Sequence, residues 1–184
     1  SSFKAAHLQL IKTYLLFKRY SDGLVAAETA FGIFPDDQAI LNQYARALRF
    51  GKDLNSAKSK LMLLSDKYPK HCEIHNQLAI VLRELGEYEN SIKTSEAILA
   101  LDSSFKAAHL QLVATHFFFG KYRDGLAAAE LACRLFPDDQ AVLTQYLRVS
   151  CCNHQLQKAR SKLTEICNRL PHRLDIKNVH ALAF

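Results

Sequence analysis

The sequence contains few residues that break regular structure and no stretch that could cross a membrane. Its 184 residues include six glycines, four prolines, one methionine and no tryptophan. Because glycine and proline are sparse, we expect neither a long flexible linker nor a disordered tail. No apolar run approaches the roughly 18 residues of a membrane-spanning helix, and the first residues lack the layout of a secretory signal. We therefore expect no membrane insertion.

Cysteine is too scarce and too irregular to build a disulfide framework. The five cysteines are odd in number and follow no regular spacing. We interpret them as small buried thiols of a protein in a reducing compartment, which predicts an intracellular, cytoplasmic location. Cys151, Cys152 and His154 look like half of a metal site, but no second pair of ligands follows at suitable spacing. We expect neither a bound metal nor a cofactor.

Motifs for catalysis are also missing, and the charge is only mildly positive. Lysine and arginine number 24 against 18 aspartates and glutamates, a net charge of +6 that is scattered along the chain. This balance favours acidic partners without requiring nucleic acid. The sequence has no glycine-rich phosphate loop, no nucleophile elbow and no His-Glu-x-x-His motif. We expect no catalytic residues and no intrinsic enzyme activity.

What the sequence does contain is repetition. The ten residues Ser1–Leu10, SSFKAAHLQL, recur unchanged as Ser103–Leu112, 102 residues later. All four prolines fall on one grid of 34 residues, on which Ser103 takes the remaining slot: Pro35, Pro69, Pro137 and Pro171. A fixed period of this size predicts a solenoid and excludes a helical bundle with accidental periodicity. The chain begins within this grid and without a methionine, so we expect it to be a fragment of a longer protein.

Each period carries two apolar stretches with helical spacing, separated by a short polar break. In the first period Leu8, Ile11 and Leu15 follow the 3–4 spacing of an amphipathic helix. No strict alternation competes, so we predict an all-α chain of about eleven helices in antiparallel pairs. Aspartates after the prolines should cap the next helix, and glycines in the breaks should adopt positive φ: Asp37, Asp139, Gly51, Gly86 and Gly120. We treat residues 1–184 as a single array of five units and a partial sixth: 4–37, 38–71, 72–105, 106–139, 140–173 and 174–184.

These residues resemble the tetratricopeptide repeat family, whose unit has 34 residues and ends in proline. That family also has small residues where the paired helices cross, and the matching positions here are all small: Gly23, Ala57, Ser91, Gly125 and Ala159. The resemblance covers essentially the whole chain and implies a right-handed superhelix whose first helices line a concave, protein-binding groove. Two further family positions are looser, as at Ile11 and Leu64, which should alter helix angles locally.

Two related functions fit less well. Pentatricopeptide repeats bind single-stranded RNA with a similar build, but their unit is usually one residue longer, so nucleic acid is not expected. Some tetratricopeptide proteins grip a carboxylate with a clamp of lysine, asparagine and arginine. The clamp positions here are occupied by other residues: Leu8, Lys12, Gln43, Glu73 and Gln77. The resemblance therefore disfavours binding of a chaperone tail.

The expected groove contains regularly spaced carboxamides. Glutamine occupies the sixth position of every complete unit, and asparagine precedes it twice: Gln9, Gln43, Gln77, Gln111, Gln145, Asn42 and Asn76. Such amides can pair with the backbone of an extended peptide, and the row is similar to the asparagine ladder of O-linked N-acetylglucosamine transferase superhelices. The alternative is that the glutamines form hydrogen bonds between helices or merely favour helix.

Basic and aromatic side chains share the same expected groove. The basic residues are Lys12, Arg46, Arg49, Arg83 and Arg148, opposed by Glu73 and Glu84. Their planar guanidiniums suit an acidic or phosphorylated peptide or a terminal carboxylate, unless they form salt bridges within the chain. Apolar side chains, Leu15 and Leu16 and then Phe117 and Phe118, could anchor a partner or pack between units.

We therefore expect a scaffold or adaptor that binds an extended acidic or mixed acidic and apolar segment of a partner protein. One alternative is a repeat domain that recruits substrate for a larger enzyme, such as a glycosyl- or sulfotransferase. A further alternative is self-association through the ends of the solenoid.

Overall fold

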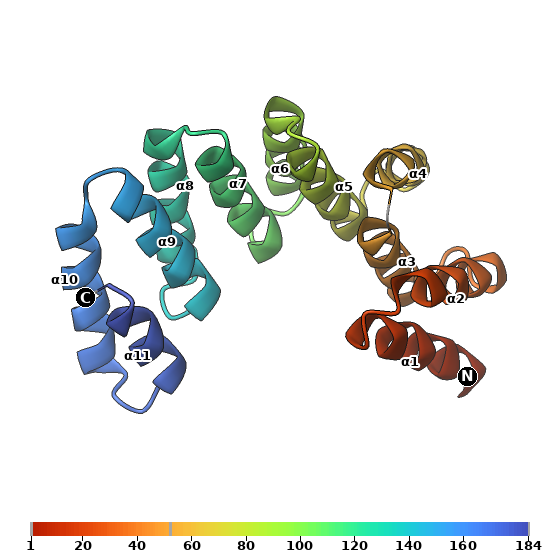
Figure 1. Cartoon of the computed structure of the whole chain (residues 1–184), viewed down its shortest axis with the longest axis horizontal. Helices are drawn as coiled ribbons and strands as arrows, with labels where there is room; N and C mark the ends of the chain where they lie inside the picture. The colour runs from red at the N-terminus through yellow and green to blue at the C-terminus, as the bar shows by residue number, and fades with distance from the viewer. Residues whose placement is uncertain (1, 52, 184) are drawn as a thin grey trace. The chain divides into compact units, whose positions relative to one another are not determined.

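The computed structural model describes residues 2–51 and 53–183, which form eleven α-helices and no strand (Figure 1). Their bounds are α1 Ser2–Leu16, α2 Tyr20–Ile33, α3 Gln38–Phe50, α4 Leu54–Lys67, α5 Cys72–Glu84, α6 Tyr88–Leu101, α7 Lys106–Phe118, α8 Tyr122–Leu135, α9 Gln140–Cys152, α10 Leu156–Arg169 and α11 Leu174–Ala181. In this part of the chain no helix is long and apolar enough to cross a membrane.

The chain divides into two compact units, residues 1–94 and 95–184, with the boundary inside α6. Within unit 1 the helices α1 and α2 pack against each other and against α3, and α3 and α4 both pack against α5. Within unit 2 the same arrangement joins α7, α8 and α9, and then α9, α10 and α11. We call α1, α3 and α5 the first helices of unit 1, and α7, α9 and α11 the first helices of unit 2.

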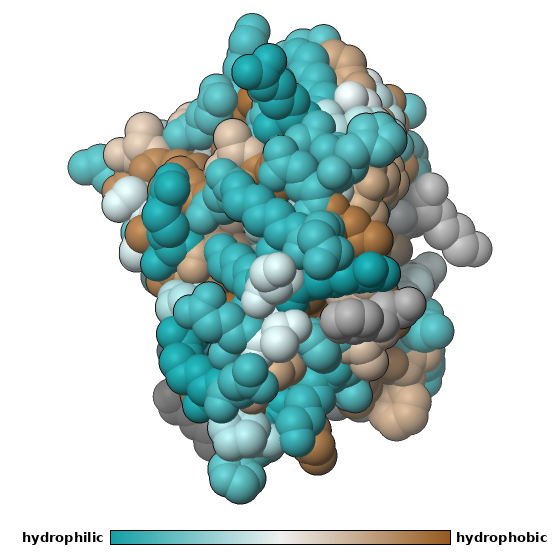
Figure 2. All heavy atoms as spheres, turned by 90° about the vertical axis from the view of Figure 1, so that its left-hand side faces the viewer, coloured by the Kyte–Doolittle hydropathy of each residue, from teal (hydrophilic) through white to brown (hydrophobic). Residues whose placement is uncertain are grey.

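Each unit has its own apolar core. In unit 1 the fully buried side chains include Ile11, Ile40, Leu41, Leu61 and Ile74. Figure 2 views the molecule from the side on which α10 lies in Figure 1, and this face is mostly hydrophilic with small hydrophobic areas. The corresponding helices build the core of unit 2, whose largest fully buried side chains are Val113, Leu143, Tyr146, Leu163 and Ile176.

Helices α3, α5, α7, α9 and α11 begin 34 residues apart, at the first residues of the units proposed from the sequence. The division into repeats itself stays a prediction. The expected aspartate caps are present: Asp37 Oδ1 accepts from the N–H groups of Ala39 and Ile40, both at 3.1 Å. Asp139 caps α9 in the same way. These bonds satisfy N–H groups that a helix terminus cannot pair internally.

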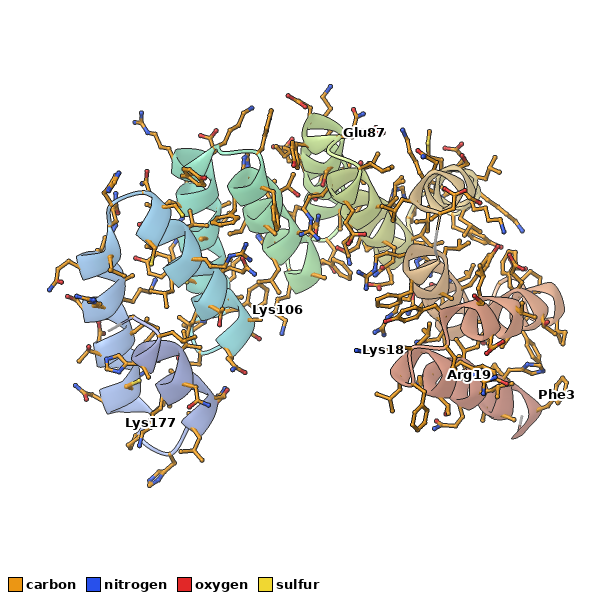
Figure 3. All side chains as sticks on the ribbon, viewed as in Figure 1. Phe3, Lys18, Arg19, Glu87, Lys106 and Lys177 are labelled. Atoms are coloured by element: carbon orange, nitrogen blue, oxygen red, sulfur yellow. The ribbon has the colours of Figure 1, made fainter. Side chains whose placement is uncertain are left out.

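In the four breaks between paired helices that the structure describes completely, one residue at a fixed place is left-handed. Gly86 and Gly120 have φ of +79° and +77°, as expected. Lys18 and His154 occupy the same place with φ of 58° and 55° (Lys18 is labelled in Figure 3). The expectation of positive φ at Gly51 is wrong, because Gly51 stands one residue before this place and has a φ of −60°.

Small residues allow the paired helices to approach closely. A Cβ on Gly23 would come within 3.1 Å of Leu15 Cδ2, and a Cβ on Gly125 would come within 3.2 Å of His116 Cβ. The other three crossing residues, Ala57, Ser91 and Ala159, are buried. The close approach expected from the sequence is therefore present in both units.

The cysteines differ from their expected environment. Cys133 is buried, and burial raises the pKa of its thiol. Cys151 and Cys152 are exposed at the end of α9, while Cys72 and Cys167 are half-buried. The interpretation of all five as buried thiols is wrong, because the other four lie near helix ends or on faces that no neighbouring helix covers completely.

Candidate functional site

The carboxamides expected to line a groove do not form a row of exposed groups. Gln43, Gln77 and Gln111 are only 9%, 4% and 5% exposed. Gln9 is exposed, and Gln145 is half-buried. First helices pack side by side within each unit, but the glutamines on them differ widely in exposure. The exposed part of the set is therefore smaller than the sequence suggested.

Several of these amides are engaged within the chain. Gln77 donates a 2.7 Å hydrogen bond to Glu73 Oε1 one turn earlier. Gln111 donates to Thr115 Oγ1 at 3.2 Å, and Gln145 accepts a long 3.5 Å bond from Arg148. All three contacts lie within a single helix, so none of them is the hydrogen bond between helices that the alternative named.

Three carboxamide oxygens in unit 1 are buried and make no hydrogen bond with any residue that the structure describes. They belong to Asn42, Asn76 and Gln77, all on α3 and α5. A buried acceptor without a partner costs free energy, commonly about 1–3 kcal/mol. The surface between α3 and α5 is thus polar and incompletely satisfied.

Three of the four predicted basic residues of unit 1 lie on α3 and α5. Arg46 is exposed and makes no hydrogen bond or ion pair with the described residues, and Lys12 on α1 is exposed as well. Arg49 lies 3.8 Å from Glu84, and Arg83 lies 3.8 Å from the same carboxylate. Burial lowers the pKa of the Arg49 guanidinium, the Glu84 charge raises it, and the Arg46 charge lowers it further.

Aromatic residues that the sequence analysis did not single out position Arg49. Its guanidinium carbon lies 4.0 Å from the centroid of the Phe50 ring. That ring stacks on Tyr20, with centroids 5.2 Å apart and an interplanar angle of 9°. The sequence signals were two aromatic residues: Phe50 at the end of α3 and Tyr20 at the start of α2.

In unit 2 the structure brings four predicted residues together. Arg148 on α9 lies 4.1 Å from the centroid of Phe117 and 5.5 Å from that of Phe118, both on α7. The two phenylalanine rings meet edge to face at 5.6 Å, and Gln145 contacts Arg148. Phe117 packs partly into the core, whereas Phe118 is 53% exposed. Phe118 and Arg148 therefore present an apolar and a cationic group side by side.

The leucine pair expected to turn inward in the first repeat is split. Leu15 packs against the core of unit 1, whereas Leu16 is 79% exposed. Successive residues on a helix point about 100° apart, so only one of them can meet the core. Leu15 is therefore a packing residue rather than an anchor for a partner.

A histidine that the sequence analysis did not select caps α5. His71 Nδ1 accepts from the N–H group of Ile74 at 3.4 Å. Its Nε2 is buried and has no hydrogen-bond partner among the described residues. Burial, the largest cause, lowers the pKa of His71. The signal in the sequence was its place, since Asp37 and Asp139 occupy the corresponding position in two other repeats.

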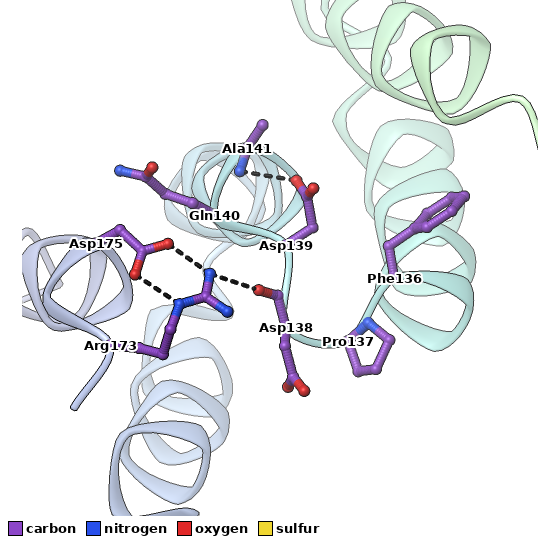
Figure 4. A pocket seen from close by; sticks show the side chains of 8 residues that line it. All are labelled: Phe136, Pro137, Asp138, Asp139, Gln140, Ala141, Arg173 and Asp175. Carbon is purple, nitrogen blue, oxygen red and sulfur yellow. Dashed lines mark hydrogen bonds and ion pairs between the residues drawn. The ribbon is translucent and has the colours of Figure 1, made fainter. Parts of the chain in front are cut away.

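The surface of unit 2 also carries a hollow of about 600 Å³ beside the start of α9 (Figure 4). Its charged groups all have partners within the chain, Asp138 with Arg169 and Asp139 with Lys106 among them. Arg173 donates to both carboxylate oxygens of Asp175, at 2.8 and 2.6 Å, and to the backbone oxygen of Asp138. The pKa of Asp175 is lowered to about 2, chiefly by the hydrogen bond from Arg173. This hollow is therefore an internal ion-pair network rather than an open charged site.

Comparison with known proteins identifies the fold of the chain. The sequence matches no protein-family profile. No curated protein sequence matches it either. Among solved structures, it matches a thermophilic tetratricopeptide-repeat protein of Thermus thermophilus at 19% identity and a TM-score of 0.74, covering 98% of each chain.

Two further structures show the same likeness. MamA from Desulfovibrio magneticus RS-1 is 15% identical with a TM-score of 0.69, over 94% of this chain and 98% of that one. Yeast Tom70 is 12% identical with a TM-score of 0.76, over 98% of this chain and 39% of that one. The chain thus has the all-α fold of tetratricopeptide-repeat solenoids, as its sequence predicted.

Proposed function

We propose that the chain binds an extended segment of a partner protein through the exposed side chains of its first helices. The observation that carries this proposal is the pairing of Arg148 with the exposed Phe118 on neighbouring helices of unit 2. An arginine beside an exposed aromatic ring is a common anchor in protein interfaces. Unit 1 supplies exposed cations at Lys12 and Arg46.

The proposed ligand is acidic or alternates acidic and apolar residues. In unit 2 a carboxylate would pair with Arg148, and a large apolar side chain would pack on Phe118; in unit 1 a carboxylate would pair with Arg46. The buried oxygens of Asn42 and Asn76 would accept backbone N–H groups only after small side-chain movements, so we assign most of the recognition to the arginines. In this role the chain acts as a scaffold or adaptor without chemistry of its own.

A pair of labelled degenerate peptide libraries would test this function. One library combines glutamate with leucine and phenylalanine, and the other replaces each glutamate with lysine. We expect the acidic library to bind, and the Arg46→Glu, Arg148→Glu double variant to weaken its binding at least tenfold, since each lost charged contact contributes about 1.5–3 kcal/mol. Arg134→Glu, at an exposed position on α8, is the matched control. Equal binding of both libraries would contradict an acidic ligand.

Self-association is a second candidate that one specific observation favours. The ten residues shared by α1 and α7 differ in exposure: Ala6 and Gln9 are exposed, whereas Ala108 is fully buried and Gln111 nearly so. The surface around Ala6 and Gln9 therefore has a sequence that, in its second copy, is covered by other parts of the protein. Light scattering over a concentration series would detect a dimer, and Ala6→Glu should abolish that dimer.

The remaining expectations stay proposals. We propose a cytoplasmic, reducing location. The alternative role as the substrate-recruiting part of a larger enzyme would be decided by a catalytic domain elsewhere in the full-length protein. We propose no nucleic-acid ligand and no cofactor.

A further inference from the structure

A group of three arginines and one carboxylate on α3 and α5 of unit 1 has a further consequence for the ligand. We call Arg46, Arg49, Arg83 and Glu84 the arginine cluster. Arg46 and Arg49 stand three residues apart on α3, which places them on one side of that helix. Arg83 and Glu84 are the last two residues of α5, the helix that packs beside α3.

The guanidinium of Arg49 is held in place before any ligand arrives. It lies over the ring of Phe50, which stacks on Tyr20, and its side chain is only 21% exposed. An arginine fixed in this way loses little side-chain entropy when it binds an anion. This distinguishes Arg49 from a free surface lysine or arginine.

The internal carboxylate meets Arg49 only at a long distance. One oxygen of Glu84 lies 3.8 Å from Arg49 and 3.8 Å from Arg83. A charge-assisted hydrogen bond between such groups is typically about 2.7–2.9 Å long, so both contacts are long ion pairs rather than direct bonds. Arg49 Nε is in addition buried and has no hydrogen-bond partner among the described residues.

The charges leave a net positive site for an anion. Three guanidiniums and the Glu84 carboxylate sum to a charge of +2. Glu73, which also acts on Arg49 and accepts a 2.7 Å hydrogen bond from Gln77, lowers this sum to +1. The repulsion between the neighbouring Arg46 and Arg49 guanidiniums would be relieved by an anion placed between them. A phosphate monoester carries about −1.5 to −2 charges at neutral pH and three strong acceptor oxygens.

We propose that the arginine cluster binds a phosphorylated serine or threonine side chain of the partner segment. This inference rests on the proposed function and adds a specific chemical group to it. Glu84 acts as an internal placeholder, which releases Arg49 and Arg83 when the phosphate arrives. The nearby carboxylates of Glu73 and Glu84 disfavour a continuous polyphosphate backbone, so we argue for a phosphopeptide rather than RNA.

The test uses the full chain and three fluorescein-labelled nonapeptide libraries that differ only at the central residue. That residue is phosphoserine, serine or glutamate, and the flanking positions are mixtures of leucine, phenylalanine, glutamate and glycine. Fluorescence anisotropy should show about tenfold or stronger binding of the phosphoserine library over the serine library, as expected for one or more charge-assisted hydrogen bonds. The glutamate library should be intermediate.

Variants separate a ligand role from a structural one. Arg46→Ala and Arg49→Lys should each remove most of the phosphoserine preference, since lysine keeps the charge but loses the planar fork. Glu84→Gln should strengthen phosphoserine binding severalfold, because it removes the competing carboxylate. Arg134→Ala on α8 should change nothing. Far-ultraviolet circular dichroism and urea midpoints identify any variant that fails to fold, and Glu84→Gln, a gain of binding, cannot be explained by misfolding.

Each outcome decides the inference. Equal binding of all three libraries overturns the phosphate site while the proposed function stands. Binding of none of them overturns both. A phosphoserine preference that survives Arg46→Ala and Arg49→Lys also overturns the site. A single-stranded RNA decamer that binds more tightly than the phosphoserine library, with the same dependence on Arg46, would replace the phosphopeptide by nucleic acid and overturn the proposal.

Discussion

The guanidinium carbon of Arg148 lies 4.1 Å from the centroid of the Phe117 ring. Arg148 belongs to α9 and Phe117 to the last turn of α7, so this contact joins two first helices of unit 2. In unit 1, Arg49 lies over Phe50 at 4.0 Å, within α3 alone. In each unit a phenylalanine near the end of a first helix fixes an arginine at the surface where we propose that the partner binds.

The Arg148–Phe117 contact should contribute measurably to stability. A cation above an aromatic ring contributes about 0.5–1 kcal/mol at partly exposed sites. We expect a double-mutant cycle of Arg148→Met and Phe117→Leu, measured by urea unfolding, to give a coupling free energy of that size. Arg134→Met combined with Phe117→Leu is the control, and its coupling should be near zero. Strictly additive effects at Arg148 would show that the two groups do not attract each other.

At the left-handed positions in the breaks, replacing glycine and introducing glycine should change the stability of the fold in opposite directions. Gly86→Ala should destabilise the fold by about 1–2 kcal/mol, because alanine is strained at positive φ although space around the added Cβ is open. Lys18→Gly should stabilise it by up to about 1 kcal/mol, since glycine removes that strain but costs more backbone entropy.

Gly32 supplies the matched control for these changes. It lies in the last turn of α2, and nothing stands within 4 Å of an added Cβ. Gly32→Ala should therefore stabilise the fold by up to about 0.5 kcal/mol, less than for a glycine in the middle of a helix. Urea unfolding of the three variants measures the sign of each change in the free energy of unfolding. A Gly86→Ala variant as stable as the unsubstituted chain would disprove the strain argument.

Two substitutions should separate the capping hydrogen bonds of Asp37 from its ion pair with Lys4. Asp37→Ala loses both the bonds to the α3 N–H groups and the 2.7 Å ion pair with Lys4, whereas Asp37→Asn keeps a capping side chain. We expect Asp37→Ala to cost about 1 kcal/mol more than Asp37→Asn in the free energy of unfolding. Equal losses would mean that the ion pair, rather than the cap, is what stabilises this terminus.

The same aspartate predicts a pH effect of definite sign. The hydrogen bond from Lys4, followed by that from the Ile40 N–H, holds the pKa of Asp37 below its usual value. Its stabilising contribution is therefore complete above the unfolded pKa of about 3.9 and declines as the pH falls through the folded pKa. Acid titration of the unfolding midpoint should show a smaller decline in Asp37→Asn than in the natural sequence.

His71 predicts a second pH effect at milder acidity. Because burial lowers its pKa in the folded chain, its contribution is complete above the unfolded pKa of about 6.5 and is lost as the pH falls through the lower folded pKa. Protonation also removes the Nδ1 acceptor that caps α5.

His71→Asn provides the comparison, since asparagine caps a helix without titrating in this range. We expect the stability of the natural sequence, relative to His71→Asn, to fall as the pH drops from about 7 to about 5 in thermal unfolding. His116, whose pKa burial also lowers, is unchanged in both proteins and cancels in the difference. A difference that does not vary with pH would show that His71 is not titrating at the helix terminus.

The helices and their caps could be predicted because their signals are local. The proline grid and the spacing of apolar residues located the helix pairs, and Asp37 and Asp139 indicated two caps. Gly51 misled because it does not share the 34-residue spacing of the left-handed residues Lys18, Gly86, Gly120 and His154, two of which are not glycine. His71 escaped notice because a histidine caps a helix only in the right tautomer and orientation.

The sequence by itself determined the repeat period, the all-α fold class and the residue types on the first helices, since each depends on regular spacing along the chain. Only the tertiary structure decided which of those residues are available. It buried Gln43, Gln77 and Gln111, and it brought Arg148 to Phe117 and Arg49 to Glu84. Exposure and charge pairing depend on contacts between helices far apart in the chain, and a periodic pattern does not specify them.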